Sequence, residues 1–389
     1  MNHLRGALLL LPLMLAGCEP FKAWTEFGGQ DSRLQFVGRM QRVEDEGVRY
    51  AYPGSMVRFR CHCTDVDLAF ESEGKGGDKH TDFINVFVDG EHVSTLELDK
   101  ESRLLSAARD LPPGEHLIEA VKRTGPYAGT IKFVGLALVG NLLDPPPLPS
   151  RRIEVLGDSI SCGYGNEARI AAPKNTEPNT GYHSRNEDNS KSYGALLGRH
   201  FDAQVVTTCM MGRGVLRNPD GSTENTFPSR YTRLFSEQAD SKDEAENKAN
   251  IWDTRAYVPD LIISQLGNID FTVPDEGKLP TAPDPVLFKA AYAKFVRELR
   301  QRYPSATILC TVGPTMTDYY PKDRKHWTLI QQYVREMVHE LGDPKVHAFA
   351  HLPSPGDFYG EDWHPTADLH QRMSKELITV IERSTSLGW

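Results

Sequence analysis

The chain has 389 residues, of which 39% are hydrophobic and 25% are charged. This is the composition of a globular protein, and the length is sufficient for two domains, each with its own core. The net charge is −9 at pH 7 and no run of Lys or Arg occurs, which excludes the electrostatic attraction that nucleic acid or an anionic membrane surface requires. We therefore expect no nucleic-acid partner and a substrate that is neutral or acid-tolerant.

The first residues have the pattern of an export signal. Arg5 precedes an apolar stretch, Ala7 to Leu15, that is too short to span a bilayer. Leu15-Ala16-Gly17-Cys18 then resembles the bacterial lipobox, in which small residues precede a cysteine that becomes lipidated and forms the new N-terminus. We expect residues 1 to 18 to be a lipoprotein signal and the exported protein to be anchored to a membrane only through lipidated Cys18, facing the periplasm or the cell exterior. A plain signal peptide that releases the mature protein is the alternative.

Five cysteines remain if Cys18 is lipidated, namely Cys61, Cys63, Cys162, Cys209 and Cys310. An odd number leaves at least one without a disulfide partner. Cys61 and Cys63 lie two positions apart in a strand-like segment, and we expect them to be buried thiols that do not bridge each other. A zinc site that includes His62 is an alternative, but no second Cys or His pair follows at metal-ligand spacing, so we expect no metal.

Residues 34 to 143 contain short β-rich runs separated by turn signals. The runs are Val57–Cys63, Phe83–Val88, Val93–Leu98, His116–Val121 and Thr130–Val139. Because no long helical pattern interrupts them, we expect an antiparallel sandwich. Asp89-Gly90 predicts a hairpin turn between the second and third runs. Residues 144 to 150 are rich in proline and predict a stiff, extended linker.

Residues 151 to 389 alternate between apolar strand runs and helical stretches. Strands are expected at Ile153–Leu156, Ala203–Thr208, Leu261–Leu266, Thr307–Val312 and Val346–Phe349, and helices at Ser192–His200, Val286–Tyr303, Thr328–Leu341 and Thr366–Arg383. Strands that are apolar on both faces indicate a parallel sheet flanked by helices, with reactive loops beyond the carboxyl ends of the strands. The polar insertions 186–191 and 238–250 are interpreted as solvated loops.

Ser159 and His364 are the candidates for catalysis. The first strand of the second domain leads directly into Gly157-Asp158-Ser159, so Ser159 stands at the turn where a nucleophile is exposed. A serine hydroxyl is a weak nucleophile at neutral pH, and an imidazole that titrates near about pH 6.5 is the usual base. Among 13 histidines, His364 is favoured because Asp362 precedes it by two positions and is expected to orient the ring. The alternative is that Asp362 caps a helix and His364 lies on the surface.

The order of four motifs resembles that of the SGNH, or GDSL, hydrolases. The motifs are Gly157-Asp158-Ser159, a glycine motif after the second strand, Leu266-Gly267 before Asp270, and Asp362-Trp363-His364-Pro365. Together with the β-rich N-terminal region, the segment Gly212 to Asn218 resembles carbohydrate esterase family two, over roughly residues 34 to 385. The resemblance implies an α/β SGNH-type hydrolase domain preceded by an all-β jelly-roll sandwich, and an activity like that of acetyl xylan esterases.

The resemblance also implies roles for individual residues. Ser159 is the implied nucleophile, His364 the general base and then acid, and Asp362 the partner of His364. The backbone N–H groups of Gly212 and Ser159 would donate to the oxyanion, whose charge develops only in the transition state. No cofactor is implied. Three aromatic residues are candidates for stacking on sugar rings, with a place in the core as the alternative: Trp363, Tyr164 and Trp327.

One motif departs from the family pattern. The family has Leu-Gly-x-Asn-Asp-Phe, in which Asn is the third oxyanion donor, whereas Ile269 stands at that position here and Asn268 lies one place early. A missing donor lowers the rate by on the order of a hundred- to a thousand-fold. We therefore expect a lowered activity, with Asn268 as a donor only if the loop is locally shifted.

These patterns predict a serine esterase that removes O-acetyl groups from a polysaccharide such as xylan or glucomannan through an acyl-enzyme. Its expected partner is an acetylated plant polysaccharide or oligosaccharide. One alternative is the same chemistry on another small acyl ester. The other is a carbohydrate-binding lipoprotein whose hydrolase site has decayed; Ile269 favours it, and the intact Ser159, Asp362 and His364 argue against it.

Overall fold

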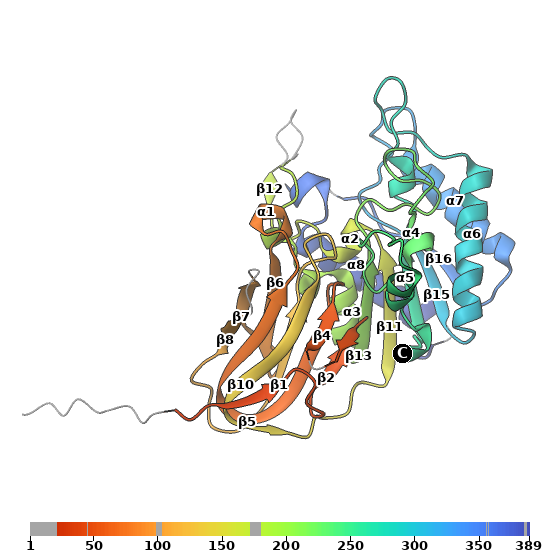
Figure 1. Ribbon diagram of the computed structural model, residues 1–389. Helices are drawn as coiled ribbons and strands as arrows, with labels where there is room; N and C mark the ends of the chain where they lie inside the picture. Colours follow the sequence, from red (N-terminus) through yellow and green to blue (C-terminus); the bar gives the residue numbers. More distant parts are fainter. Residues whose placement is uncertain are drawn as a thin grey trace, which may run out of the picture.

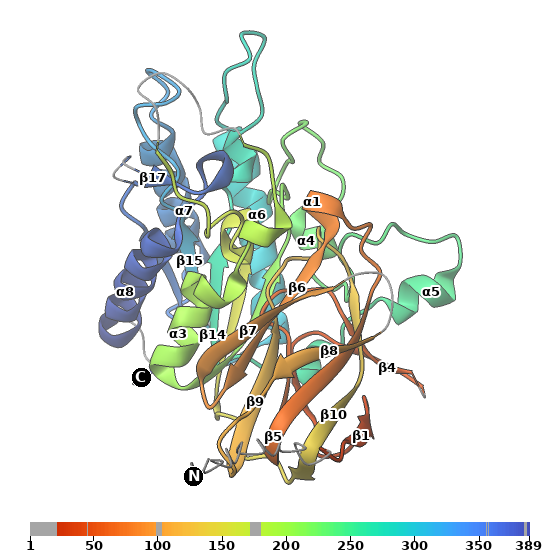
Figure 2. The ribbon, with the colours of Figure 1, turned by 90° about the vertical axis from the view of Figure 1, so that its left-hand side faces the viewer.

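The computed structural model describes residues 22–44, 46–98, 103–171, 180–354, 356, 358–384 and 387–389. The expected signal segment and Cys18 lie outside these residues. Within the described ranges, no helix is long and apolar enough to cross a membrane. The chain forms an all-β region followed by an α/β region, which lie side by side (Figures 1 and 2).

In the described residues, the N-terminal region is a ten-stranded antiparallel sheet. Its strands are β1 (Thr25–Gly28), β2 (Gln35–Val37), β3 (Gln41–Val43), β4 (Gly47–Tyr50), β5 (Met56–Ser72), β6 (Asp82–Val88), β7 (Glu91–Leu98), β8 (Arg103–Ala108), β9 (Glu115–Lys122) and β10 (Ile131–Leu143), with the short helix α1 (Gly77–His80) before β6. The first half of β5 pairs with β9 and its second half with β8, while β10 runs along both halves. The sheet encloses one apolar core that includes Phe59, Phe70 and Phe133. The predicted hairpin is confirmed, because Asp89 and Gly90 both have positive φ between β6 and β7.

The expectation for Cys61 and Cys63 is wrong, because the structure joins them in a disulfide. Alternate residues of a strand share a face, and the Cα atoms of this pair are 5.5 Å apart, within the usual range for a disulfide. The zinc alternative therefore loses its two thiolates. Cys162 and Cys209 form a second disulfide, and Cys310 is a buried free thiol.

The C-terminal region contains a five-stranded parallel sheet in the order β13-β11-β14-β15-β16. In chain order, the elements are β11 (Arg151–Gly157), α2 (Ser159–Cys162), β12 (Ile170–Ala171), α3 (Tyr193–Phe201), β13 (Ala203–Cys209), α4 (Phe227–Arg230), α5 (Glu244–Ala249), β14 (Leu261–Gln265), α6 (Pro285–Arg302), β15 (Thr307–Val312), α7 (His326–Leu341), β16 (Val346–Ala350), β17 (Phe358–Tyr359) and α8 (Ala367–Ser384). Helices α3 and α8 pack on one face and α6 and α7 on the other, so the predicted fold class is confirmed. β11 is the first strand of this sheet along the chain, and it lies between β13 and β14, the next two. Its carboxyl end is therefore a topological switch point, where α/β proteins place their sites.

A buried ion pair connects the two regions. Arg39, from the loop between β2 and β3, donates from Nη2 to Oε1 of Glu154 on β11 over 2.9 Å, and both side chains are buried. The guanidinium also lies over the ring of Tyr231, 4.7 Å from its centroid. A buried charge without its partner is strongly destabilising, so this pair holds the regions in one arrangement.

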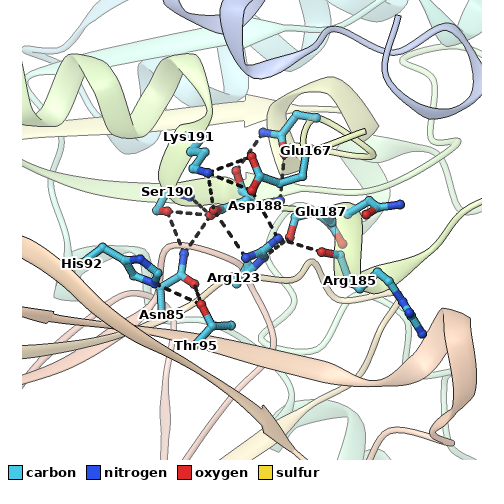
Figure 3. A network of polar contacts seen from close by, with 12 residues as sticks. Asn85, His92, Thr95, Arg123, Glu167, Arg185, Glu187, Asp188, Ser190 and Lys191 are labelled. Atoms are coloured by element: carbon cyan, nitrogen blue, oxygen red, sulfur yellow. Dashed lines mark hydrogen bonds and ion pairs between the residues drawn. The ribbon is translucent and has the colours of Figure 1, made fainter. Parts of the chain in front are cut away.

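The expectation that residues 186–191 form a solvated loop is wrong. Glu187, Asp188, Asn189 and Ser190 are buried, because this segment lies between the two regions of the chain. Figure 3 shows its polar contacts, among them the bond from Asn85 Nδ2 on β6 to Asp188 Oδ1 over 3.0 Å. The other insertion, 238–250, contains α5, none of whose residues is buried.

Candidate active site

Ser159 begins α2 directly after β11, at the switch point of the parallel sheet. Asp158 caps this helix by accepting a hydrogen bond at Oδ1 from the N–H of Ile160 over 3.0 Å. Ser159 Oγ lies 2.8 Å from Nε2 of His364, although 205 positions separate the two residues in the sequence. The two sequence-predicted residues are therefore in hydrogen-bond contact at the carboxyl end of β11, as a serine and its base must be.

In the described part of the chain, no hydrogen bond joins the Asp362 carboxylate to the His364 ring, although the sequence predicted one. Nδ1 of His364 faces the backbone carbonyl oxygens of Glu361 at 3.0 Å and Asp362 at 3.1 Å. The Asp362 carboxylate instead accepts from the Tyr164 hydroxyl over 2.5 Å and from the N–H of Gly181 over 2.9 Å. Asp362 has a φ of 47°, in the left-handed region, and in this conformation its carbonyl faces the ring while its carboxylate is bound by Tyr164 and Gly181.

The carbonyl contacts determine the tautomer of His364. A carbonyl oxygen can only accept, so Nδ1 carries the proton and donates it. Nε2 then presents its lone pair to the hydroxyl of Ser159. This is the protonation state that a general base requires. Two backbone carbonyls hold the Nδ1 proton here, whereas the sequence predicted that the Asp362 carboxylate would do so.

Desolvation determines how readily His364 is protonated. Burial lowers the pKa of its imidazole to about 4, although the carbonyl contacts of Glu361 and Asp362 and the charge of Asp362 act to raise it. A lowered pKa extends the neutral form, which accepts the serine proton, to lower pH. The ring is consequently a competent base throughout the range above about pH 4.

We expect kcat/KM for a soluble acetyl ester such as para-nitrophenyl acetate to fall on the acid side with a midpoint near pH 4, since this parameter reports the free enzyme. An unperturbed imidazole would place that midpoint near about pH 6.5. Tryptophan fluorescence is recorded at each pH, and a spectrum that does not change across the midpoint excludes acid unfolding. A midpoint close to the unperturbed value would contradict a desolvated ring.

Tyr164 has a role at the site that the sequence did not indicate. Its ring stacks on the His364 imidazole, with centroids 3.9 Å apart and planes inclined by 16°. The same residue holds the Asp362 carboxylate through its hydroxyl. One face of Tyr164 is therefore covered by the imidazole, and the residue supports the loop that carries His364.

The two tryptophans considered for sugar stacking lie in different surroundings. Trp363 is next to His364, is 37% exposed, and packs edge-on against Tyr359 with centroids 4.6 Å apart. Trp327 lies in the first turn of α7 and donates from Nε1 to the carbonyl of His351 over 3.4 Å. No contact found in the described residues brings Trp327 to Ser159 or His364, so Trp363 is the better placed of the two.

Gly212 lies on the loop that follows β13 and has a φ of 66°, which only glycine adopts readily. Asp270 holds this loop, because its carboxylate accepts hydrogen bonds from the N–H groups of Val215, Leu216 and Arg217 over 2.7 to 2.9 Å. Burial raises the pKa of Asp270 to about 6 despite these bonds. The disulfide between Cys162 and Cys209 joins α2 to the end of β13 and so links the segments that carry Ser159 and Gly212.

Asn268 and Ile269 lie just before Asp270. Asn268 is 6% exposed, and neither its Oδ1 nor its Nδ2 has a hydrogen-bond partner among the described residues. Its Nδ2 packs closely against Gly313, where an added Cβ would lie 2.6 Å away. Ile269 begins a short 3-10 turn, Ile269–Phe271, and is half-buried. No contact of the Asn268 side chain with Ser159 or Gly212 is found in the described part of the chain.

The parallel α/β sheet and the contact between Ser159 and His364 are the arrangement of a serine hydrolase. A model of the GDSL-like lipase/acylhydrolase family matches residues 155–372, and a model of the carbohydrate esterase 2 N-terminal domain matches residues 36–147. The chain therefore belongs to the GDSL-like lipase/acylhydrolase family, and its resemblance to carbohydrate esterase family two is confirmed. It is a carboxylic ester hydrolase.

Relatives align with both regions of the chain. An acetylxylan esterase/glucomannan deacetylase of Cellvibrio japonicus is 30% identical over 355 residues, which cover 91% of this chain and 89% of that protein. The structure of a family two carbohydrate esterase from Clostridium thermocellum in complex with cellohexaose has a TM-score of 0.79 and 28% identity, and the match covers 92% of this chain and 99% of that chain. A family two carbohydrate esterase from Cellvibrio japonicus has a TM-score of 0.78 and 28% identity, with 93% and 98% covered.

Proposed function

We propose that this chain removes O-acetyl groups from a polysaccharide such as xylan or glucomannan, with Ser159 as nucleophile and His364 as general base. The observation that carries the proposal is the contact of 2.8 Å between Ser159 Oγ and His364 Nε2. The substrate class is supported by the relatives, which include an acetylxylan esterase/glucomannan deacetylase and an esterase in complex with cellohexaose.

In the proposed reaction, Ser159 Oγ attacks the acetyl carbonyl while Nε2 of His364 takes its proton. The backbone N–H groups of Ser159 and Gly212 donate to the oxyanion of the tetrahedral intermediate. The protonated imidazole, whose Nδ1–H remains bonded to the carbonyls of Glu361 and Asp362, then returns a proton to the leaving sugar hydroxyl. Water hydrolyses the acetyl-enzyme with His364 again as base.

The test is acetate release from acetylated xylan and acetylated glucomannan by the soluble form that lacks residues 1 to 18. We expect release from at least one glycan, and rates on soluble esters that fall as the acyl chain is lengthened beyond acetyl. Faster cleavage of long-chain esters, with no acetate from glycans, would favour an esterase for another acyl ester. Binding of the glycans without hydrolysis of any ester would favour a decayed site.

We also propose that the protein is exported and anchored through a lipid on Cys18. The proposal is supported by the apolar stretch Ala7 to Leu15 followed by Ala16-Gly17-Cys18. Fractionation of cells that produce the wild type or Cys18→Ser tests it, because the variant without a lipid-accepting thiol should leave the membrane fraction.

A further inference from the structure

The acceptors of His364 Nδ1–H are backbone atoms, so their position depends on the conformation of residues 361–363. Asp362 and Trp363 have φ angles of 47° and 65°. This left-handed conformation is unfavourable for residues with a side chain and persists only where surrounding contacts enforce it. The contacts that enforce it therefore also position the carbonyls that hold the imidazole.

The Glu361 side chain supplies three of these contacts. It is 2% exposed. Its Oε2 accepts from the N–H of His183 over 2.9 Å, and its Oε1 accepts from Nδ1 of His183 and from Nδ2 of Asn186, each over 2.7 Å. With Gly181, whose N–H binds the Asp362 carboxylate, all of these donors belong to one segment, residues 180–191, which we call the bridging loop.

The bridging loop is in turn held by the all-β region. Arg123, directly after β9, donates from Nε to the carbonyl of Glu187 over 2.8 Å and from Nη2 to the carbonyl of Arg185 over 2.7 Å. Figure 3 shows Arg123 between these residues and Asp188, whose carboxylate also binds Asn85. The bridging loop is thus hydrogen-bonded on one side to Arg123 of the all-β region and on the other to Glu361, whose backbone carbonyl accepts from Nδ1 of His364.

We infer that Glu361 is a positioning residue for the general base, and that the all-β region holds His364 in place for proton transfer through Arg123 and the bridging loop. The inference rests on the proposed roles of Ser159 and His364. Proton transfer requires heavy atoms within hydrogen-bond reach, and a small displacement of the base has a large effect on rate. Removing these contacts should therefore lower the rate of the chemical step and leave substrate binding unchanged.

The experiment compares full-length Glu361→Ala, Glu361→Gln and Arg123→Ala with the wild type. For para-nitrophenyl acetate, we expect Glu361→Ala to lower kcat about tenfold with little change in KM. Glu361→Gln, which keeps one acceptor oxygen, should recover part of the loss, and Arg123→Ala should lower kcat in the same direction by less. The second-order rate of Ser159 phosphonylation should fall in parallel, because it reports the serine–histidine pair without a glycan. The amount of protein that is phosphonylated when the reaction is complete gives the concentration of folded sites, and all rates are expressed per folded site.

Arg58→Ala is the matched control. Arg58 is buried to a similar degree as Arg123, with side chains 9% and 11% exposed, but it pairs with Glu119 inside the all-β region. Its kcat per folded site should equal that of the wild type. If Glu361→Ala does not fold, Asn186→Ala, which removes one of the three hydrogen bonds, takes its place.

Unchanged kcat and phosphonylation rates in the Glu361 or Asn186 variant would overturn the inference, and so would an equal loss in Arg58→Ala. Ser159→Ala distinguishes a failure of the proposed catalytic roles from a failure of the inference about Glu361. If Ser159→Ala were as active as the wild type, the proposed catalytic roles would fail. If it is inactive while Glu361→Ala is fully active, the inference alone fails.

Discussion

Replacing Ser159 with alanine should lower kcat for acetate release by roughly 10⁴- to 10⁶-fold, because removal of a nucleophile leaves only binding and oxyanion stabilisation. In the proposed reaction Ser159 Oγ forms the covalent bond to the acetyl group, so the variant cannot form the acyl-enzyme. The measurement is single-turnover and steady-state acetate release at neutral pH, with binding of the glycan followed separately. We expect glycan binding to persist in the variant.

Ser161→Ala is the control for this substitution, since Ser161 lies two residues further along α2. Its Oγ is paired with the Tyr193 hydroxyl at 2.7 Å, not with His364, so the variant should keep most of the activity. The double variant Ser159→Ala/His364→Ala should be no slower than Ser159→Ala, because residues that act as a unit are not additive. A Ser159→Ala variant with more than a small fraction of wild-type kcat would contradict the nucleophile assignment.

The architecture could be predicted because its signals are local and repeated. Each strand of the parallel sheet is a short apolar run, such as Thr307–Val312, and each is separated from the next by a helical pattern or a polar loop. Ser159 and His364 could be found because each lies in a short motif at the end or beginning of an element. The short strands β1 to β4, of three or four residues each, have too few alternating positions to give such a signal.

The support of the base could not be predicted, because it depends on contacts between distant segments. Asp362 precedes His364 by two positions, and this spacing favoured a carboxylate–imidazole pair. Its left-handed φ reverses which group faces the ring, and nothing in the residue types Asp-Trp-His indicates that conformation. Polar composition likewise suggested a solvated loop at 186–191, whereas its partners Arg123 and Glu361 lie 64 and 175 positions away from Glu187 and Asn186.

Replacing Ile269 with asparagine should raise kcat about a hundredfold, because it supplies the third oxyanion donor that the family pattern has at this position. Ile269 is half-buried and directly precedes Asp270, the residue that holds the loop of Gly212 through three backbone N–H groups. A donor here acts on charge that develops only in the transition state, so KM should change little. The measurement is kcat and KM for para-nitrophenyl acetate and for an acetylated oligosaccharide.

Ile269→Asp is the matched control for this gain, since aspartate has the shape of asparagine but, when ionised, donates no hydrogen bond and repels an oxyanion. It should be slower than the wild type. Asn268→Ala decides whether the chain already has a third donor, because the Asn268 amide is buried without a partner among the described residues. Its Nδ2 packs against Gly313, so we expect little change in kcat. If kcat falls strongly in Asn268→Ala and does not rise in Ile269→Asn, Asn268 already donates to the oxyanion. Isoleucine in place of asparagine at position 269 then has no effect on the rate.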